Sequence, residues 1–277
     1  MGKINRREVI HRFESLAEFM DYADGPTDMT GYRSSRSDTA KWYGSETWEE
    51  AKTQAFTWTT GVESIRVARA KIDTVEVETI RKRSMDRGTI NIGEALIGLP
   101  DCRRKRVKVE STDDNNGAVV DIVLNATVSG GIGGEIIATR GAAVLALSDS
   151  LENAGKQTRI TVVSANGGAG RRHYGEWAVV VKHPGRKASM ASYAWAVANP
   201  GFLRRAVFSA MERMDRVTRK AFNVPGGYGS VIDIPKDRFP GAIVVQGALY
   251  GDHQWSSAES AREWVDDTLK SQGIDVA

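Results

Sequence analysis

The sequence predicts an α/β protein with a central mixed sheet flanked by helices, and three neighbouring segments carry this prediction. Residues 119–124 form a short β-branched run, and a segment rich in Gly, Ser and Thr follows it. A helix-like run over 140–155 and a second β-branched strand at 159–164 come next, which together predict one βαβ unit. In such a unit a ligand binds where the first strand gives way to the helix, so we expect function there.

The composition is that of an ordinary globular protein. The 277 residues are 41% hydrophobic and 26% charged, with a formal net charge of +3, and no apolar run is long enough to cross a bilayer. The N-terminus also lacks the apolar region of a secretory signal, so we expect no membrane contact and a cytoplasmic location. A single cysteine, Cys102, and four scattered histidines give no disulfide and no metal-ligand spacing, so we expect no cofactor.

We expect two regions along the chain: a mostly helical N-terminal extension over 1–110 that packs on the core, and the α/β domain over 111–277. A helical pattern covers 62–86. Residues 106–110 alternate in polarity, and the Asn-Gly pair at 116–117 favours a hairpin between them and 118–124. The basic run at 103–108 would then flank the central sheet.

The C-terminal half continues the α/β pattern. A glycine-rich loop over 165–175 joins the strand at 159–164 to one at 176–182, and it lacks the patterns of a phosphate cradle, so we interpret it as a hairpin loop. Helices are expected at 188–198, 201–222 and 256–270, and further strands at 230–234 and 241–246.

The segment between strand and helix, which we call the crest, covers residues 125–131. Its polar members are Asn125, Thr127 and Ser129, followed by Gly130 and Gly131. On this spacing and on the order of elements, residues 118–272 resemble a von Willebrand factor A-like (vWA) domain. In that family Asp-x-Ser-x-Ser holds a magnesium ion that binds a partner's carboxylate. Asn125 stands where the aspartate belongs, which removes the main attraction for a divalent ion, so the resemblance implies a degenerate metal-dependent adhesion site (MIDAS) without bound metal.

The whole chain also looks like a group of uncharacterised bacteriophage and prophage proteins. The residues that carry this resemblance are Trp-Tyr-Gly at 42–44 and Pro-Gly-Phe-Leu-Arg-Arg at 200–205. The resemblance implies a viral origin, and therefore the cytoplasm of the host cell, without supplying an activity.

Three functional hypotheses follow. The first is a non-enzymatic binding or assembly protein that uses the crest to contact a phage or host protein, with self-association as a further option, because no set of nucleophile, base and orienting residue is evident. The second is nucleic-acid binding through basic clusters at 81–83, 103–108 and 204–220. Its principal residues are Arg81, Lys82, Arg83, Arg103, Arg104, Lys105, Arg106, Lys108, Arg204 and Arg205. The third and weakest is a metal-dependent hydrolase that uses Asp121, Glu135, Asp149 or Asp252.

Overall fold

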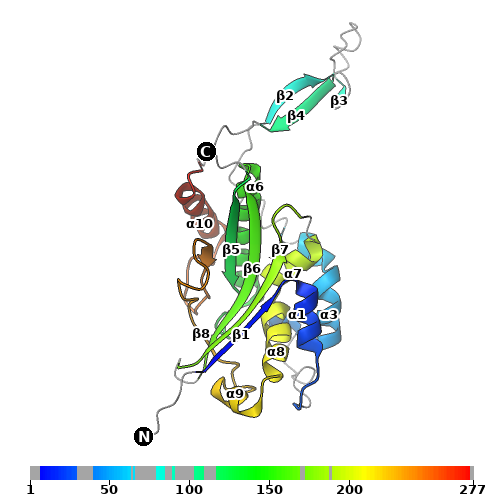
Figure 1. Ribbon diagram of the computed structural model, residues 1–277. Coiled ribbons are helices and arrows are strands. Elements are labelled where there is room, and N and C mark those ends of the chain that lie inside the picture. The colour runs from blue at the N-terminus through cyan, green and yellow to red at the C-terminus, as the bar shows by residue number, and fades with distance from the viewer. Residues whose placement is uncertain are drawn as a thin grey trace.

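The computed structural model describes residues 7–29, 40–63, 65, 79–84, 89–90, 103–108, 117–168, 172–186 and 189–274. Its main element is a six-stranded mixed sheet in the order β1-β7-β6-β5-β9, with β8 paired to β6 (Figure 1). The strands are β1 (Glu8–Phe13), β5 (Val119–Asn125), β6 (Gln157–Gly167), β7 (Tyr174–Lys182), β8 (Ser230–Val231) and β9 (Ile243–Val245). Helices flank this sheet, so the prediction of an α/β fold with a mixed sheet is confirmed.

The predicted βαβ unit is present. Strand β5 pairs in parallel with β6, from Val119 opposite Gln157 to Asn125 opposite Val163, and helix α6 (Gly134–Asn153) connects them. On its other side β5 pairs in parallel with β9. The chain therefore leaves the carboxyl end of β5 between two parallel neighbours on opposite sides. This is a topological switch point, where ligands bind in open α/β sheets.

The N-terminal part of the chain contains strands that were not expected there. Strand β1 pairs in parallel with β7 and forms an edge of the central sheet, so the expected boundary at residue 110 divides segments that the sheet joins. Residues 79–84, which were expected to be helical, form β2 (Thr79–Ser84). A separate three-stranded sheet has the order β2-β4-β3, with β4 at Arg103–Lys108 and β3 at Thr89–Ile90.

The expected hairpin between 106–110 and 118–124 is wrong. Strand β4 pairs antiparallel with β2 and β3, whereas the two neighbours of β5 are β6 and β9. Since β5 is hydrogen-bonded on both sides, it has no free edge at which β4 could pair, and the basic run at 103–108 does not flank the central sheet. The other predicted hairpin is confirmed, because β6 and β7 pair antiparallel from Gly167 and Tyr174 onwards.

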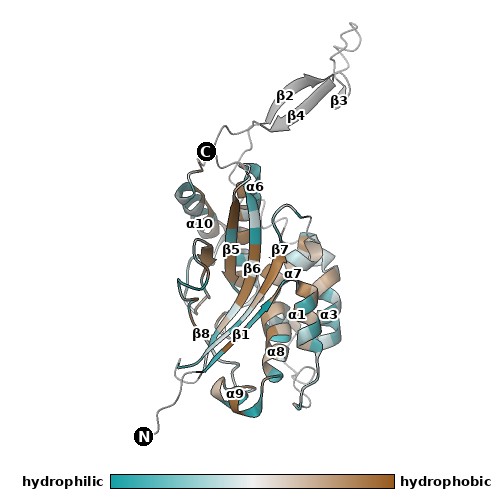
Figure 2. Ribbon diagram, viewed as in Figure 1, coloured by the Kyte–Doolittle hydropathy of each residue, from teal (hydrophilic) through white to brown (hydrophobic). Residues whose placement is uncertain are grey.

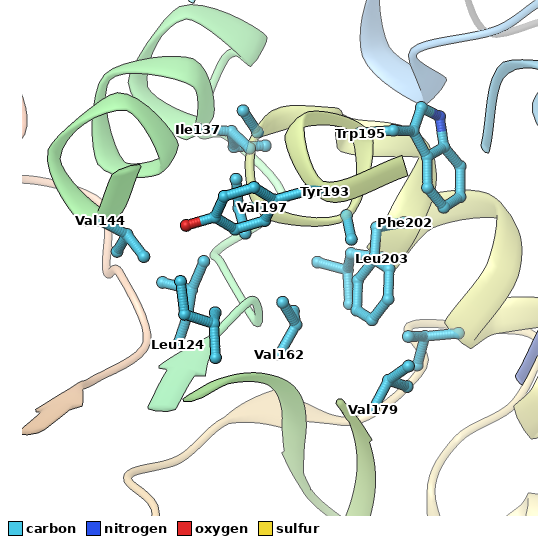
Figure 3. Close-up of a cluster of buried hydrophobic side chains, with 14 of the residues drawn as sticks. Leu124, Ile137, Val144, Val162, Val179, Tyr193, Trp195, Val197, Phe202 and Leu203 are labelled. Carbon is cyan, nitrogen blue, oxygen red and sulfur yellow. The ribbon is translucent and has the colours of Figure 1, made fainter. Parts of the chain in front are cut away.

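The helices cover one face of the central sheet. Buried residues of α1 (Leu16–Asp24), α3 (Trp48–Thr57), α6, α7 (Met190–Ala198) and α10 (Ala258–Ser271) share one hydrophobic core with the strands. Figure 3 shows this core, where Leu124, Val162 and Val179 of the strands lie beneath the helical residues. Strand alternation sends Val123 and Val163 to the opposite face, where they pack with Ile234 in a smaller core. Figure 2 shows brown, hydrophobic stretches within β5 and β6, which agrees with the burial of Leu124, Val162 and Val163.

The helix expected over 201–222 is divided into three pieces. It begins as the π-helical segment η2 (Phe202–Val207), continues as α8 (Phe208–Glu212), and restarts as α9 (Arg216–Ala221). Asp215 causes the restart, because its carboxylate accepts hydrogen bonds from the backbone N–H groups of Val217 and Thr218. A short helix α2 (Ala40–Tyr43) precedes α3, and residues 59–63 after α3 are also helical. Within the described residues, none of the helices combines the length and apolar character needed to cross a bilayer.

Candidate functional site

Asn125 closes strand β5 and is fully buried. Its Nδ2 donates to the carbonyl oxygen of Ile232 at 2.9 Å, and its Oδ1 accepts from the N–H groups of Thr127 and Ala165, both at 3.2 Å. The amide therefore ties β5 to β6 and to the segment before β9. It acts inside the fold and does not face the solvent.

The crest hydroxyls also have partners. The hydroxyls of Thr127 and Ser164 share a hydrogen bond of 3.2 Å, and Ser129 Oγ accepts from the N–H of Tyr250 at 3.3 Å. We expected these hydroxyls to bond backbone groups of the crest or the start of α6. Instead they reach β6 and the loop after β9. In the part of the chain that the structure describes, no group of three or more His, Cys, Asp or Glu side chains is placed to hold a metal ion.

A cavity of about 510 Å³ opens beside the crest, at the carboxyl ends of β5 and β6. Of the predicted crest residues, Thr127, Ser129 and Gly130 line it, whereas Gly131 lines a smaller neighbouring cavity of about 180 Å³. Val128 of the crest also contributes, and the remaining walls come from distant segments. They are Trp42, Tyr43, Asn166, Leu203, Arg204, Phe208, Gly226, Gly227, Tyr228, Gly229, Ser230, Val231 and Leu249.

Aromatic side chains form much of the cavity wall, and the sequence analysis did not predict that they would lie here. The Trp42 indole donates from Nε1 to the carbonyl oxygen of Gly130 at 2.9 Å, which fixes it against the crest. The rings of Phe208 and Tyr228 stack in parallel, with centroids 3.9 Å apart and an interplanar angle of 6°. Tyr228 has a φ of 53°, a left-handed conformation, within a segment that is otherwise glycine at 226, 227 and 229. This loop forms another part of the cavity wall.

Arg204 is the charged residue of the cavity. It is only 2% exposed, and its guanidinium donates to the carbonyl oxygens of Trp42 at 2.8 Å and Ile132 at 2.7 Å. The guanidinium carbon lies 4.2 Å from the centroid of the Trp42 ring, a cation–π contact. Burial lowers the pKa of Arg204 to about 10, so the side chain is still a cation at neutral pH. Among the described residues no carboxylate lies within 4.0 Å of it.

Arg205 is buried next to Arg204 but has a different environment. It is 4% exposed, donates to the carbonyl oxygens of Ser45 and Glu46, and lies over the ring of Tyr43. It does not line the cavity. The expectation that Arg204 and Arg205 form part of a nucleic-acid-binding surface is therefore corrected, because both arginines act inside the fold.

The other two basic clusters come together in the small sheet. Strands β2 and β4 place Arg81 opposite Arg106, Lys82 opposite Lys105, and Arg83 opposite Arg104. Arg103 and Lys108 belong to the same strand β4. The structure thus joins the clusters at 81–83 and 103–108, as nucleic-acid binding would require, but it does not add the arginines of η2 to them.

The acidic residues of the hydrolase hypothesis lie apart. Asp121 is on β5 with a carboxylate oxygen 3.6 Å from Arg159, and Asp252 accepts a 2.6 Å hydrogen bond from the N–H of Leu249. Glu135 lies in the first turn of α6, and Asp149 lies near its other end. They form no common cluster among the described residues.

Comparison with known proteins assigns the chain to a family. A family model described as a domain of unknown function (DUF7192) matches residues 2–276. The chain belongs to this family. No curated protein and no solved structure gives a match. The DUF7192 match spans the small sheet, the central sheet and the cavity.

Proposed function

We propose that this DUF7192 protein is a non-enzymatic binding or assembly protein whose crest and adjoining cavity receive a group of a protein partner. The observation that carries the proposal is the cavity of about 510 Å³ at the carboxyl ends of β5 and β6. Its volume falls in the usual range for ligand sites, about 300–1,000 Å³, and its position is that of ligands in open α/β sheets. The binding position also matches the vWA-like arrangement that the crest motif suggests.

The chemistry of the lining supports binding over catalysis. The described residues around the cavity include no carboxylate, imidazole, thiol or lysine amine, and Arg204 is their only cation. General acid–base or nucleophilic catalysis needs a group that exchanges a proton or attacks near neutral pH. Tyrosine, hydroxyl and backbone groups can position a ligand but supply no such base by themselves.

The rim of the site supports a protein as the partner. Leu249 is 46% exposed and Tyr250 is 83% exposed, and both lie in the loop that follows β9. This loop is bonded to the crest through Ser129, so the exposed side chains stand beside the cavity. Exposed aromatic and aliphatic side chains beside a pocket are typical of protein–protein contacts. The phage or host origin of the partner rests on the resemblance to phage proteins alone.

A pair of glycine substitutions tests the proposal. A Cβ atom added at Gly130 or at Gly133 meets nothing within 4 Å, but only Gly130 lines the cavity. We expect a partner that co-purifies with the wild-type protein from expressing or infected cells to be lost in Gly130→Phe and retained in the matched control Gly133→Phe. Nuclease treatment should not release it. A partner that remains bound to Gly130→Phe would place its binding site elsewhere.

The register of the small sheet supports a second candidate function, nucleic-acid binding. Three successive cross-strand pairs of β2 and β4 are cation opposite cation. Like charges directly opposite one another destabilise a sheet, and phosphate groups between them would remove that cost. We propose that this pair of strands binds nucleic acid without strong sequence preference.

The matching experiment is retention on immobilised DNA and RNA at increasing salt. Reversing the charges at Arg103, Arg104 and Arg106 to Glu should abolish retention at low salt, and wild-type retention should fall steeply as salt rises. Retention that the triple variant leaves unchanged would remove this candidate function.

A further inference from the structure

Arg204 is buried and has more N–H donors than the hydrogen bonds that the described structure gives it. A guanidinium carries five N–H donors, and the described structure gives this one two carbonyl partners and the face of Trp42. Carbonyl dipoles and a ring face offset only part of the cost of burying a charge. A buried cation that borders a cavity is therefore stabilised when an anion enters that cavity.

The other buried cations of the described chain differ from Arg204 in at least one of these respects. Arg140 is equally buried and also bonds two backbone carbonyls, but the cavity that it lines has a volume of only about 10 Å³. Arg219 forms an ion pair with Asp28, and Lys182 forms one with Glu152. Arg205 bonds backbone carbonyls, as Arg204 does, but borders no part of the cavity. Arg204 thus combines burial, a cavity and no carboxylate partner among the described residues.

The charge of the lining limits the kind of anion. One guanidinium among otherwise neutral and aromatic groups balances one negative charge. A phosphate dianion would leave an uncompensated charge against Trp42, Phe208 and Tyr228, which is costly in an apolar setting. A carboxylate carries a single charge, and its two oxygens match the planar fork of a guanidinium.

We propose that Arg204 binds the carboxylate of an acidic side chain that the protein partner inserts into the cavity, next to an apolar side chain that packs on the aromatic walls. This inference rests on the proposed function, since it names the group that the crest site receives. The exposed Leu249 and Tyr250 at the rim favour a carboxylate carried by a protein over a free small acid.

The test uses the indole N–H of Trp42 as a reporter in two-dimensional NMR, because Nε1 donates to Gly130 at the edge of the cavity. The probes are the capped dipeptides acetyl-Glu-Phe-amide and acetyl-Gln-Phe-amide, benzoate, and inorganic phosphate. We expect the Glu peptide to shift the signal with a Kd at least tenfold lower than the Gln peptide. Equal affinity of the two peptides, a response to phosphate or benzoate alone, or no response overturns the inference.

Two variants provide a second test that is independent of the peptide comparison on the wild-type protein. Arg204→Gln should remove the preference for the Glu peptide, whereas the matched variant Arg205→Gln should keep it. Should Arg204→Gln fail to fold, the comparison of the two peptides on the wild-type protein still decides the question. Capture that depends on Gly130 combined with equal peptide affinities would sink this inference and leave the proposed function standing. A Glu preference combined with capture that does not depend on Gly130 would show that the cavity binds a carboxylate but that the captured partner binds elsewhere, which would overturn the proposed function and, with it, the role of a partner's side chain.

Discussion

The substitution Asn125→Asp tests whether position 125 has a structural role or belongs to a site that can bind a metal ion. The substitution keeps the shape of the side chain but removes the Nδ2 donor that bonds the carbonyl oxygen of Ile232 at 2.9 Å. It sets an ionised oxygen against that carbonyl in a fully buried position. The N–H groups of Thr127 and Ala165 still favour the carboxylate, so the substitution has opposing effects.

The balance should be destabilising. Leaving a buried acceptor such as the Ile232 carbonyl without its donor costs about 1–3 kcal/mol. Burial opposes ionisation of the introduced carboxyl, and every unit by which its pKa rises adds about 1.4 kcal/mol at neutral pH. The guanidinium of Arg140, which donates to the backbone oxygen of Asn125 at 3.0 Å, limits that rise. We expect Asn125→Asp to lower the free energy of unfolding by about 3 kcal/mol at pH 7.

The assay is urea denaturation of both proteins between pH 4 and pH 8, with and without millimolar magnesium. Because the pKa of the introduced carboxyl is raised in the folded state, the loss should shrink as pH falls through that value and the acid regains a proton to donate. Equal stability of the two proteins at pH 7 would refute the reasoning. So would a saturable stabilisation of the variant by magnesium, since it would show that the carboxylate reaches a metal at the crest.

Three further predictions concern the scaffold. Gly141→Ala should lower the free energy of unfolding by about 1–3 kcal/mol in urea denaturation, because its Cβ would lie 2.4 Å from the Cβ of Ala198 on α7, whereas Gly134→Ala in the same helix meets nothing closer than 3.4 Å and should be neutral or stabilising. Burial and the charge of Arg213 lower the pKa of His11. The stability that neutral His11 contributes is therefore complete above about pH 6.5 and is lost as pH falls through the lowered pKa. His11→Phe should flatten the profile of thermal stability against pH between pH 7.5 and 5. Ser257→Ala removes the hydroxyl that caps α10 and should cost about 1 kcal/mol, measured as a lower Tm.

Local patterns predicted the part of the fold whose partners are close in sequence. Strand β5, helix α6 and strand β6 follow one another without a long insertion, and their apolar periodicities agree with the final structure. The same holds for the hairpin of β6 and β7. In both cases the residues that pair are near neighbours along the chain, so patterning and short connections are sufficient.

Long-range pairing was outside the reach of those patterns. Strand β1 finds its partner β7 more than 150 residues later, and nothing within Glu8–Phe13 indicates which strand it joins. Residues 79–84 belong to a stretch with a helical stripe, yet their pairing with β4 makes them a strand. A partner strand supplied from elsewhere overrides local propensity, as is common for sheets.

The candidate site was predicted from one side only. The motif at Asn125, Thr127 and Ser129 located the crest, but the remaining walls come from segments near residues 42, 204 and 228 that share no spacing with it. One signal was present in the sequence: Arg204 and Arg205 stand between Phe202-Leu203 and Ala206-Val207, and an arginine pair inside an apolar run indicates buried guanidinium groups. The number of basic residues alone had suggested that Arg204 and Arg205 lie on the surface, whereas both are buried.

The two proposed binding sites can be separated by their response to salt, because the cavity would bind a single charge at the buried Arg204, whereas the β2·β4 pair would bind a polyanion. Arg204 is buried and lies over the ring of Trp42, and ions screen a buried charge pair only weakly. A polyanion that bridges β2 and β4 would instead displace counterions at several phosphates and lose affinity by orders of magnitude between about 50 and 200 mM salt. Capture of a protein partner should therefore persist at a salt concentration that releases nucleic acid. If both were released together, one charged surface would be responsible for both, and the β2·β4 pair rather than the cavity would be the functional site.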